Sequence, residues 1–506
     1  MLAEFAQAIW EYIKAEPLNT FYILVGLIVG WRIFLRSIRI WRHIQLSKNL
    51  VYMRVTLPRE DSSKDKEKET EKDFREKISI MAQFYRSLHE TRELNLWNQL
   101  RVWIFQDNIF TFELVAQEKV VDFYVTLSPY YQDIVEKQIT AYYPSADISI
   151  EEPYKLFNEG ATKMKGFMAF TAKDFWFPIK TFKTIENDPL NDLTNIFTKM
   201  EQEETAVIQI TLRPTSDNWT KKAEKFGDAY FKGKKQGGGW GVSIPLLGPI
   251  INVFKGIFLG FDKMEIEPAQ GGDGFVRMLQ SKEEIAKTIG EKSNQSGFDT
   301  VIRLFSSAKT EKRAEELVNN MVVGFNIFNS GQANYFQTRR LFFIDSLNDL
   351  WFKFTFSHRL LDFPFSEKKS LLAEEELASI FHFPQSRYNY SPNIRWLAYK
   401  VLPAPTNLPK EGVLLGHNVY RGEKREIRFK RKDRSRHHYI IGKSGAGKSA
   451  LLSYMARQDV WNGDGVCVID PHGDLVEDVL SYVPKERAKD VIIFDPSAID
   501  RPMSLN

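Results

Sequence analysis

Eight residues near position 445 have the spacing of a phosphate-binding loop. They fit the pattern G-x-x-x-x-G-K-[ST] and run from Gly442 to Ser449. An apolar, β-prone run at 439–441 precedes them, and a helix-favouring run begins at Ala450. Glycines let the backbone of such a loop turn its N–H groups toward phosphate oxygens, beside the positive end of the following helix. The pattern predicts a nucleotide site, and the alternative is a glycine turn with an incidental lysine.

Each residue type in this loop has a distinct role in the predicted site. Lys448 is expected to reach the β and γ phosphates as a catalytic charge, and the Ser449 hydroxyl to ligate Mg²⁺. The backbone around them would surround the phosphates. The predicted nucleotide-binding residues are therefore Gly442, Lys443, Ser444, Gly445, Ala446, Gly447, Lys448, Ser449 and Ala450.

A second candidate catalytic residue, Asp470, follows the apolar run 466–469. It would lie at the carboxyl end of a strand, where open α/β sheets bind their ligands. From there it could polarise water or support Mg²⁺ from a neighbouring strand. The alternative is an aspartate that caps a turn.

A basic stretch lies just before the loop. From Arg421 to Arg436 there are nine basic and three acidic residues, the strongest local charge excess in the chain. The alternation from Leu415 onward predicts paired strands, so one interpretation is a solvated hairpin. The other is a surface that faces DNA, with the candidate contacts Arg428, Lys430, Arg431, Lys432, Arg434 and Arg436.

The composition is that of a globular protein of several domains. The chain has 506 residues, of which 43% are hydrophobic and 26% charged. A net charge of +4 is too small over this length to indicate nucleic acid by itself. The single cysteine, Cys467, excludes an intrachain disulfide, and its apolar neighbours predict a buried strand residue.

The first 45 residues are predicted to form a membrane anchor. The apolar run at 19–36 gives about 17 to 18 usable residues, the short end of what crosses a bilayer. Arg32, Arg36, Arg39 and Arg42 follow it. The positive-inside rule then predicts a single-pass protein of the inner (cytoplasmic) membrane, with its N-terminus outside and its bulk in the cytoplasm. A buried helix or a peripheral anchor is the alternative.

The middle of the chain predicts α+β structure in two parts. Residues 46–160 have the order β-α-β-β-α-β, the ferredoxin-like arrangement. Residues 161–370 repeat some of this order and contain an apolar helix at 242–261, which either packs on the core or touches the inner membrane leaflet. Residues 371–414 form a helix, capped by Ser370, and a proline-rich linker.

Residues 415–506 predict the start of a parallel nucleotide-binding sheet. After the loop come a helix, a strand at 466–469, a turn, a second helix and a strand at 491–494. The predicted fold class is therefore a multidomain α/β and α+β protein. Its predicted order is a transmembrane helix, a ferredoxin-like α+β region and the start of a RecA-like parallel sheet.

Several motifs around the loop together resemble one class of motor ATPases. They are the histidine-strand-loop run from His437, the turn Asp470-Pro471-His472-Gly473-Asp474, the pair Asp495-Pro496 and the closing Leu505-Asn506. The predicted helix that ends at His382-Phe383-Pro384 also resembles the segment before the motor in this class. The region 415–506 resembles the HerA–FtsK class, and within it the conjugative DNA-transfer ATPases, the coupling proteins of type IV secretion. The resemblance implies ATP and Mg²⁺ as cofactors, DNA as a partner, a homo-hexamer and contact with secretion-channel components.

The resemblance also implies that this chain lacks parts of the catalytic machinery. The class's Walker B acid, catalytic glutamate, sensor and arginine finger would lie beyond Asn506, so a C-terminally truncated, catalytically incomplete P-loop ATPase is expected. The expected function is a membrane-anchored motor that couples ATP hydrolysis to translocation of DNA or a DNA–protein complex. The alternatives are a membrane-tethered scaffold and a channel- or pilus-assembly ATPase that does not act on DNA.

Overall fold

The chain forms two compact units, Met1–Lys400 and Val401–Asn506. In the computed structural model, the described residues are 17–59, 73–91, 108–231, 280–340, 345–361, 369–397, 402–420 and 423–496. Within these ranges no helix combines the length and the apolar character needed to cross a membrane. The predicted apolar helix at 242–261 lies outside the described residues.

One antiparallel sheet organises the first unit. Nine strands of the described residues form it, in the order β4-β1-β3-β2-β6-β7-β5-β8, and β9 also pairs with β7. The strands are β1 (Val51–Thr56), β2 (Phe110–Gln117), β3 (Val120–Leu127), β4 (Asp147–Glu151), β5 (Lys163–Thr171), β6 (Thr205–Pro214), β7 (Gly297–Ala308), β8 (Phe336–Arg339) and β9 (Ser370–Ala373).

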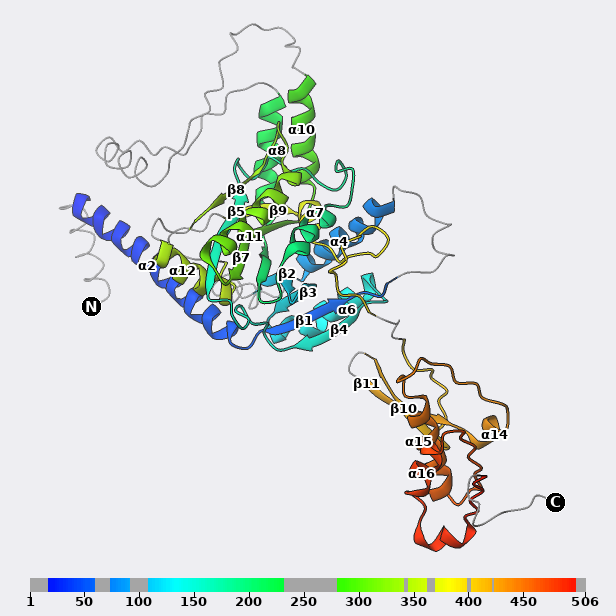
Figure 1. Ribbon diagram of the computed structural model, residues 1–506. Helices are drawn as coiled ribbons and strands as arrows, with labels where there is room; N and C mark the ends of the chain where they lie inside the picture. Colours follow the sequence, from blue (N-terminus) through cyan, green and yellow to red (C-terminus); the bar gives the residue numbers. More distant parts are fainter. Residues whose placement is uncertain are drawn as a thin grey trace, which may run out of the picture. The chain divides into compact units, whose positions relative to one another are not determined.

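Helices cover both faces of this sheet (Figure 1). Buried side chains of α4, α6, α7, α11 and α13 share the larger apolar core with one face, while α12 packs Phe352 and Phe356 on the other face. The helices are α2 (Pro17–Ser47), α4 (Asp73–Glu90), α6 (Gln132–Tyr142), α7 (Pro189–Asn195), α8 (Asn218–Phe231), α10 (Gln280–Ser293), α11 (Glu311–Gly324), α12 (Asp345–Ser357) and α13 (Glu374–Ile380), with short 3-10 turns η1 (Pro129–Tyr131), η2 (Ile196–Lys199) and η3 (Phe325–Phe328).

The sheet consists of two halves with related topology. Elements β1-α4-β2-β3-α6-β4 follow the predicted order, and their strands lie in the sheet order β4-β1-β3-β2. Strands β5, β6, β7 and β8 repeat this relation in the order β6-β7-β5-β8. The halves join where β2 pairs with β6, from Phe110↔Leu212 to Gln117↔Thr205. The sheet is therefore continuous between 46–160 and 161–370.

The helix predicted after Ser370 begins three residues later than expected, at Glu374. Residues 370–373 form β9 instead, because their backbone pairs with β7, as at Thr300↔Ser370. The prediction that Ser370 caps the helix is wrong for the same reason. At the observed start of α13, the Ala373 N–H donates to Glu376 Oε2 at 2.8 Å, and this satisfies an N–H group that has no helical partner.

The second unit contains the predicted hairpin, formed by β10 (Val413–Tyr420) and β11 (Glu423–Phe429), which pair antiparallel. It is followed by α14 (Arg431–Arg434), α15 (Lys448–Trp461), α16 (Asp474–Leu480) and the 3-10 turn η4 (Lys485–Asp490).

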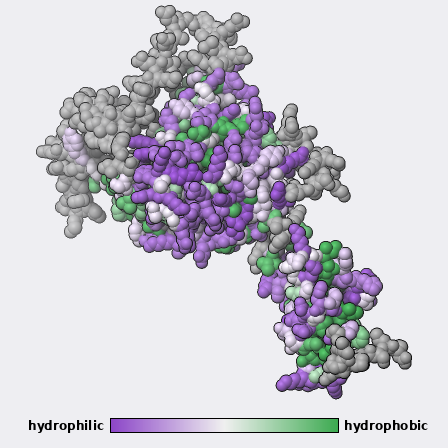
Figure 2. Space-filling view, in the orientation of Figure 1, coloured by the Kyte–Doolittle hydropathy of each residue, from purple (hydrophilic) through white to green (hydrophobic). Residues whose placement is uncertain are grey.

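The predicted parallel sheet of this unit is not formed. Among residues 402–420 and 423–496, the only strand ladder joins β10 and β11, and the segments 439–441, 466–469 and 491–494 form no strand. Their apolar side chains have no neighbouring strand to bury them, so the exposed fractions of Ile441, Ile469 and Ile492 are 79%, 89% and 82%. Cys467, predicted to be buried, is exposed as well. Figure 2 shows apolar residues gathered on the surface of this unit.

Candidate functional site

The loop at 442–447 has the backbone conformation that its glycines predict. Gly445 and Gly447 adopt left-handed φ angles of +78° and +86°, which side chains disfavour. Within the loop, the Ala446 N–H donates to the Lys443 carbonyl at 3.1 Å. Helix α15 begins immediately afterward, at Lys448. The sequence therefore folds locally into a tight turn that ends at a helix N-terminus.

The Lys448 ammonium lies over this turn. Its Nζ donates to the carbonyl oxygens of Gly442 and Lys443, at 2.8 Å and 2.9 Å. A Cβ added at Gly442 would lie 3.2 Å from the Ala446 Cβ and 3.3 Å from the Lys448 Cγ. The loop is thus compact around the lysine stem, and a glycine at this position leaves room for it.

The donors of this loop fit a polyphosphate. A lysine charge, the N–H groups at the start of α15 and the exposed Ser449 hydroxyl lie within one turn of chain. All loop residues are exposed apart from Lys448, which is half-buried, so a ligand could reach them. Mg²⁺ binds through one or two protein oxygens plus substrate phosphates, and the Ser449 hydroxyl could supply such an oxygen.

Asp470 occupies a capping position in the turn before α16. Its Oδ1 accepts from the His472 N–H at 3.3 Å, and its Oδ2 accepts from the Leu475 N–H at 2.9 Å. The Leu475 and His472 N–H groups lower the pKa of this exposed carboxyl. Both oxygens thus contact the residue's own turn, as the capping alternative expects, and the catalytic role of Asp470 stays a prediction.

The six candidate DNA contacts fall into two groups. Arg434 makes two hydrogen bonds of 2.5 Å to the buried Asp459, which raises the pKa of the guanidinium. Arg428 pairs with Glu426 at 2.9 Å and donates to the Gly412 carbonyl at 3.1 Å. These two arginines hold the fold of the unit together.

The other four candidates are available at the surface. Arg431 pairs with Asp464 at 2.7 Å, but 82% of its side chain is exposed. Lys430, Lys432 and Arg436 are exposed, and their side chains make no ion pair with the residues that the structure describes. The predicted basic surface is therefore smaller than the sequence indicates.

Sequence reasoning missed a charged network inside the first unit. Glu113 on β2 lies in one cross-strand row with Tyr124, Gln209 and Arg303. Its carboxylate accepts from Arg359 at 3.0 Å, and it also accepts from Gln209 at 2.8 Å. The exposed fractions of Glu113 and Arg359 are 0% and 4%. This buried pair lies at the centre of the sheet.

The surroundings of this pair keep its charges compensated. Tyr52 accepts a hydrogen bond from Arg359 Nη1, and Tyr154 donates one to Glu113 Oε1, both at 3.0 Å. Burial lowers the pKa of Arg359, but the nearby Glu113 carboxylate and the tyrosines raise it more, so the pKa of the arginine is raised overall. The sequence signal was a glutamate at a buried position of the apolar strand Phe110–Gln117.

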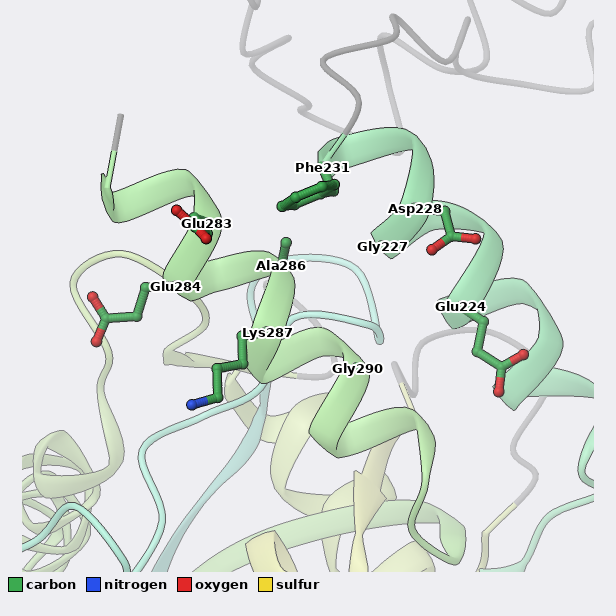
Figure 3. Close-up of a pocket in the computed structure, with 9 residues that line it drawn as sticks. All are labelled: Glu224, Gly227, Asp228, Phe231, Glu283, Glu284, Ala286, Lys287 and Gly290. Carbon is green, nitrogen blue, oxygen red and sulfur yellow. The ribbon is translucent and has the colours of Figure 1, made fainter. Parts of the chain in front are cut away.

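A cleft of the first unit lies between α8 and α10, with a volume of about 720 Å³ (Figure 3). Phe231 and Ala286 face each other across it, and Phe231 is 52% exposed. Four of its lining side chains are carboxylates and one is a lysine; they are Glu224, Asp228, Glu283, Glu284 and Lys287. A negatively charged lining opposes the binding of phosphates, so this cleft does not compete with the loop at 442–449 as a nucleotide site.

Comparison with known proteins gives two matches. Residues 63–396, about two thirds of the chain, match a family described as "Domain of unknown function (DUF8128)". Residues 415–506 match the family "Helicase HerA, central domain". This second match begins within β10 and includes the loop, so the C-terminal part is a HerA/FtsK-type P-loop ATPase region. No curated protein matches the chain.

Proposed function

We propose that this chain, which belongs to the DUF8128 family, is an ATP-driven translocase of DNA or DNA–protein complexes, because it carries a HerA-type ATPase region. The observation that carries the proposal is the loop at 442–449, with Lys448 at the start of α15 and its ammonium folded over the Gly442 carbonyl. Among the described residues, the acceptors of that ammonium are two neutral carbonyls, at 2.8 and 2.9 Å, so phosphate oxygens would be better partners.

In the proposed reaction, water attacks the γ-phosphate in line with the leaving group. Lys448 exchanges its two carbonyl acceptors for β- and γ-phosphate oxygens and stabilises the charge that develops on them. The N–H groups at the start of α15 bind the phosphates from the same side. Ser449 would hold Mg²⁺, which would supply positive charge to the phosphates.

DNA as the moved substrate is supported by the exposed basic residues beside the hairpin. Lys430, Lys432 and Arg436 offer cations that no described acid neutralises, and Arg431 adds a mostly exposed one. Contacts of this type bind the phosphate backbone of DNA without reading its sequence. This fits a translocase, which must move along any sequence.

We further propose the inner membrane as the site of action, with the N-terminus outside, and a homo-hexamer beside a secretion channel as the working form. Exposed aromatic side chains on α2 support the membrane: Trp31, Phe34 and Trp41 are 58%, 54% and 65% exposed. Aromatic rings of this kind favour the membrane interface. Cell fractionation tests the membrane location, and full recovery of the chain in the soluble fraction would contradict it.

A second candidate function is a membrane-tethered scaffold whose nucleotide site only switches assembly. The observation that favours it is the extent of the first unit, where one continuous sheet spans β4 to β8 and offers surface for protein partners. Salt-dependent DNA binding would favour the translocase, and nucleotide binding without DNA affinity would favour the scaffold.

The experiment that tests the nucleotide site is binding of a fluorescent ATP analogue with Mg²⁺. Lys448→Ala removes a charge-assisted contact worth about 1.5–3 kcal/mol, so affinity should fall by about 10- to 150-fold. Ser449→Ala should weaken binding only when Mg²⁺ is present. Lys432→Ala is the matched control, because it removes an exposed lysine charge that lies outside the loop. If a folded Lys448→Ala protein bound the ATP analogue with unchanged affinity, the assignment of the nucleotide site to 442–449 would be wrong.

A further inference from the structure

Three consecutive residues of α15 connect this helix to three different neighbours. Arg457 pairs with Asp478 of α16 at 2.5 Å. The Gln458 side-chain amide both donates to and accepts from the backbone of Leu414 in β10, at 2.9 Å each. Asp459 receives both guanidinium hydrogen bonds of Arg434 in α14. Since successive helical residues point about 100° apart, the end of α15 is fixed from three sides.

The Arg434–Asp459 pair encloses the phosphate loop within 25 residues of chain, a shorter closure than the 44 residues between Leu414 and Gln458. Arg434 precedes the loop and Asp459 follows it, so the pair closes the chain around residues 442–449. Its geometry is bidentate, and the exposed fractions of the two side chains are 25% and 8%. Such a pair fixes both distance and orientation, which a single-point contact does not.

Helix α15 transmits this constraint to the loop. Asp459 lies eleven residues after Lys448, or about 16 Å along a helix that rises about 1.5 Å per residue. Holding the far end of this rigid element against α14 fixes the direction in which its N-terminus points. The N–H groups and Lys448 at that end must meet phosphates within fractions of an ångström.

We propose that Arg434 and Asp459 are positioning residues for the nucleotide site, which act on Lys448 through α15 and touch no phosphate themselves. The inference rests on the proposed nucleotide site at 442–449. It also reassigns Arg434, because a guanidinium that already makes two hydrogen bonds to a buried carboxylate has no free charge to give to DNA.

The test is the affinity of the full chain for the fluorescent Mg·ATP analogue, measured well below each variant's melting temperature. Arg434→Ala and Asp459→Asn should each weaken binding about tenfold, as expected for a small misplacement of binding groups. The double variant should be no weaker than either single one, because both changes break the same pair. Arg434→Lys should restore only part of the affinity, since lysine cannot bind bidentately.

Arg457→Ala is the matched control, because it removes an ion pair from the same helix that lies outside the loop closure. It should lower the melting temperature and leave nucleotide affinity within about twofold. Wild-type affinity in Arg434→Ala and Asp459→Asn, with Lys448→Ala still defective, overturns the positioning role and leaves the nucleotide site intact. Absence of Lys448-dependent binding in the wild type overturns the nucleotide site and this inference together.

Discussion

The exposed basic residues beside the hairpin give the proposed DNA contact a quantitative signature. Lys430, Lys432 and Arg436 are exposed without an acidic partner in the described structure, while Arg434 is held by Asp459. Replacing the first three by alanine should weaken DNA binding and its dependence on salt. Replacing Arg434 alone should change neither, although the four side chains carry the same charge and lie within seven residues.

The size of the effect follows from counterion release. Each phosphate neutralised on duplex DNA contributes about 0.9 to the slope of log K against log salt concentration. Three lost contacts should therefore lower the magnitude of the slope by about 2.7. When the salt concentration rises from 50 to 200 mM, the factor by which DNA affinity falls should therefore be about 40 times smaller for the triple variant than for the wild type. Arg434→Ala should alter the slope by less than about 0.9, the value of one phosphate contact.

The assay is fluorescence anisotropy with a labelled duplex of arbitrary sequence, titrated at several salt concentrations without nucleotide. The same variants are then tested for binding of the ATP analogue, where the expected order reverses: the triple variant binds normally and Arg434→Ala binds weakly. A triple variant with the wild-type slope would refute the assignment of DNA contacts. An Arg434→Ala slope lowered as much as that of the triple variant would refute the division of the basic stretch into two groups.

Three further predictions concern stability. Arg359→Ala leaves a buried carboxylate without its cation and should lower the free energy of unfolding, measured in urea, by about 3–5 kcal/mol. Arg395→Ala removes a more exposed ion pair and should lower the free energy of unfolding by about 0–1 kcal/mol. Gly412→Ala should lower the melting temperature of the second unit, because the added Cβ would lie 2.2 Å from the Phe429 carbonyl oxygen and the residue has a φ of +112°. Gly416→Ala is the control and should leave the melting temperature unchanged, because no atom lies within 4 Å of its added Cβ. The pKa of Asp470 is lowered in the folded protein, so its carboxylate stabilises the fold at pH values above its unfolded pKa of about 3.9. This stabilisation should be lost as the pH falls through the lower, folded pKa. In a pH series of thermal melts, Asp470→Asn should therefore show a smaller loss of stability in acid than the wild type.

Local patterns were sufficient to predict the loop and much of the first unit. The spacing of Gly442, Lys448 and Ser449 is a property of eight residues, so no distant contact was needed to recognise it. The order of strands and helices from Val51 to Glu151 also follows from local periodicity. The edge-to-edge pairing of β2 with β6 could not be predicted this way, since it depends on residues 88 to 102 positions apart, from Gln117↔Thr205 to Phe110↔Leu212.

The roles of charged residues were harder to predict, because they depend on partners far away in the chain. The basic run at 421–436 contains arginines that look alike in sequence, and only the position of Asp459 separates Arg434 from Arg436. Burial of Glu113 likewise depends on Arg359, 246 residues later. The predicted parallel strands failed for a related reason: an apolar run such as 466–469 becomes a strand only when another strand is beside it.

Strand β1 connects the two ends of the proposed motor. It begins four residues after α2, whose His43 donates to the carbonyls of His358 and Arg359 at 2.8 and 3.1 Å. Just after β1, the Leu57 carbonyl accepts from the Leu397 N–H at 2.9 Å. Leu397 belongs to the segment that leaves the first unit toward the ATPase region.

Strain applied between α2 and the ATPase region would therefore act on β1 at both of its ends. Strand β1 is paired on both sides, with β3 and β4. A strand pulled along its axis resists through all of these ladder bonds together. The first unit is thereby suited to hold α2 and the segment at Leu397 at a fixed separation.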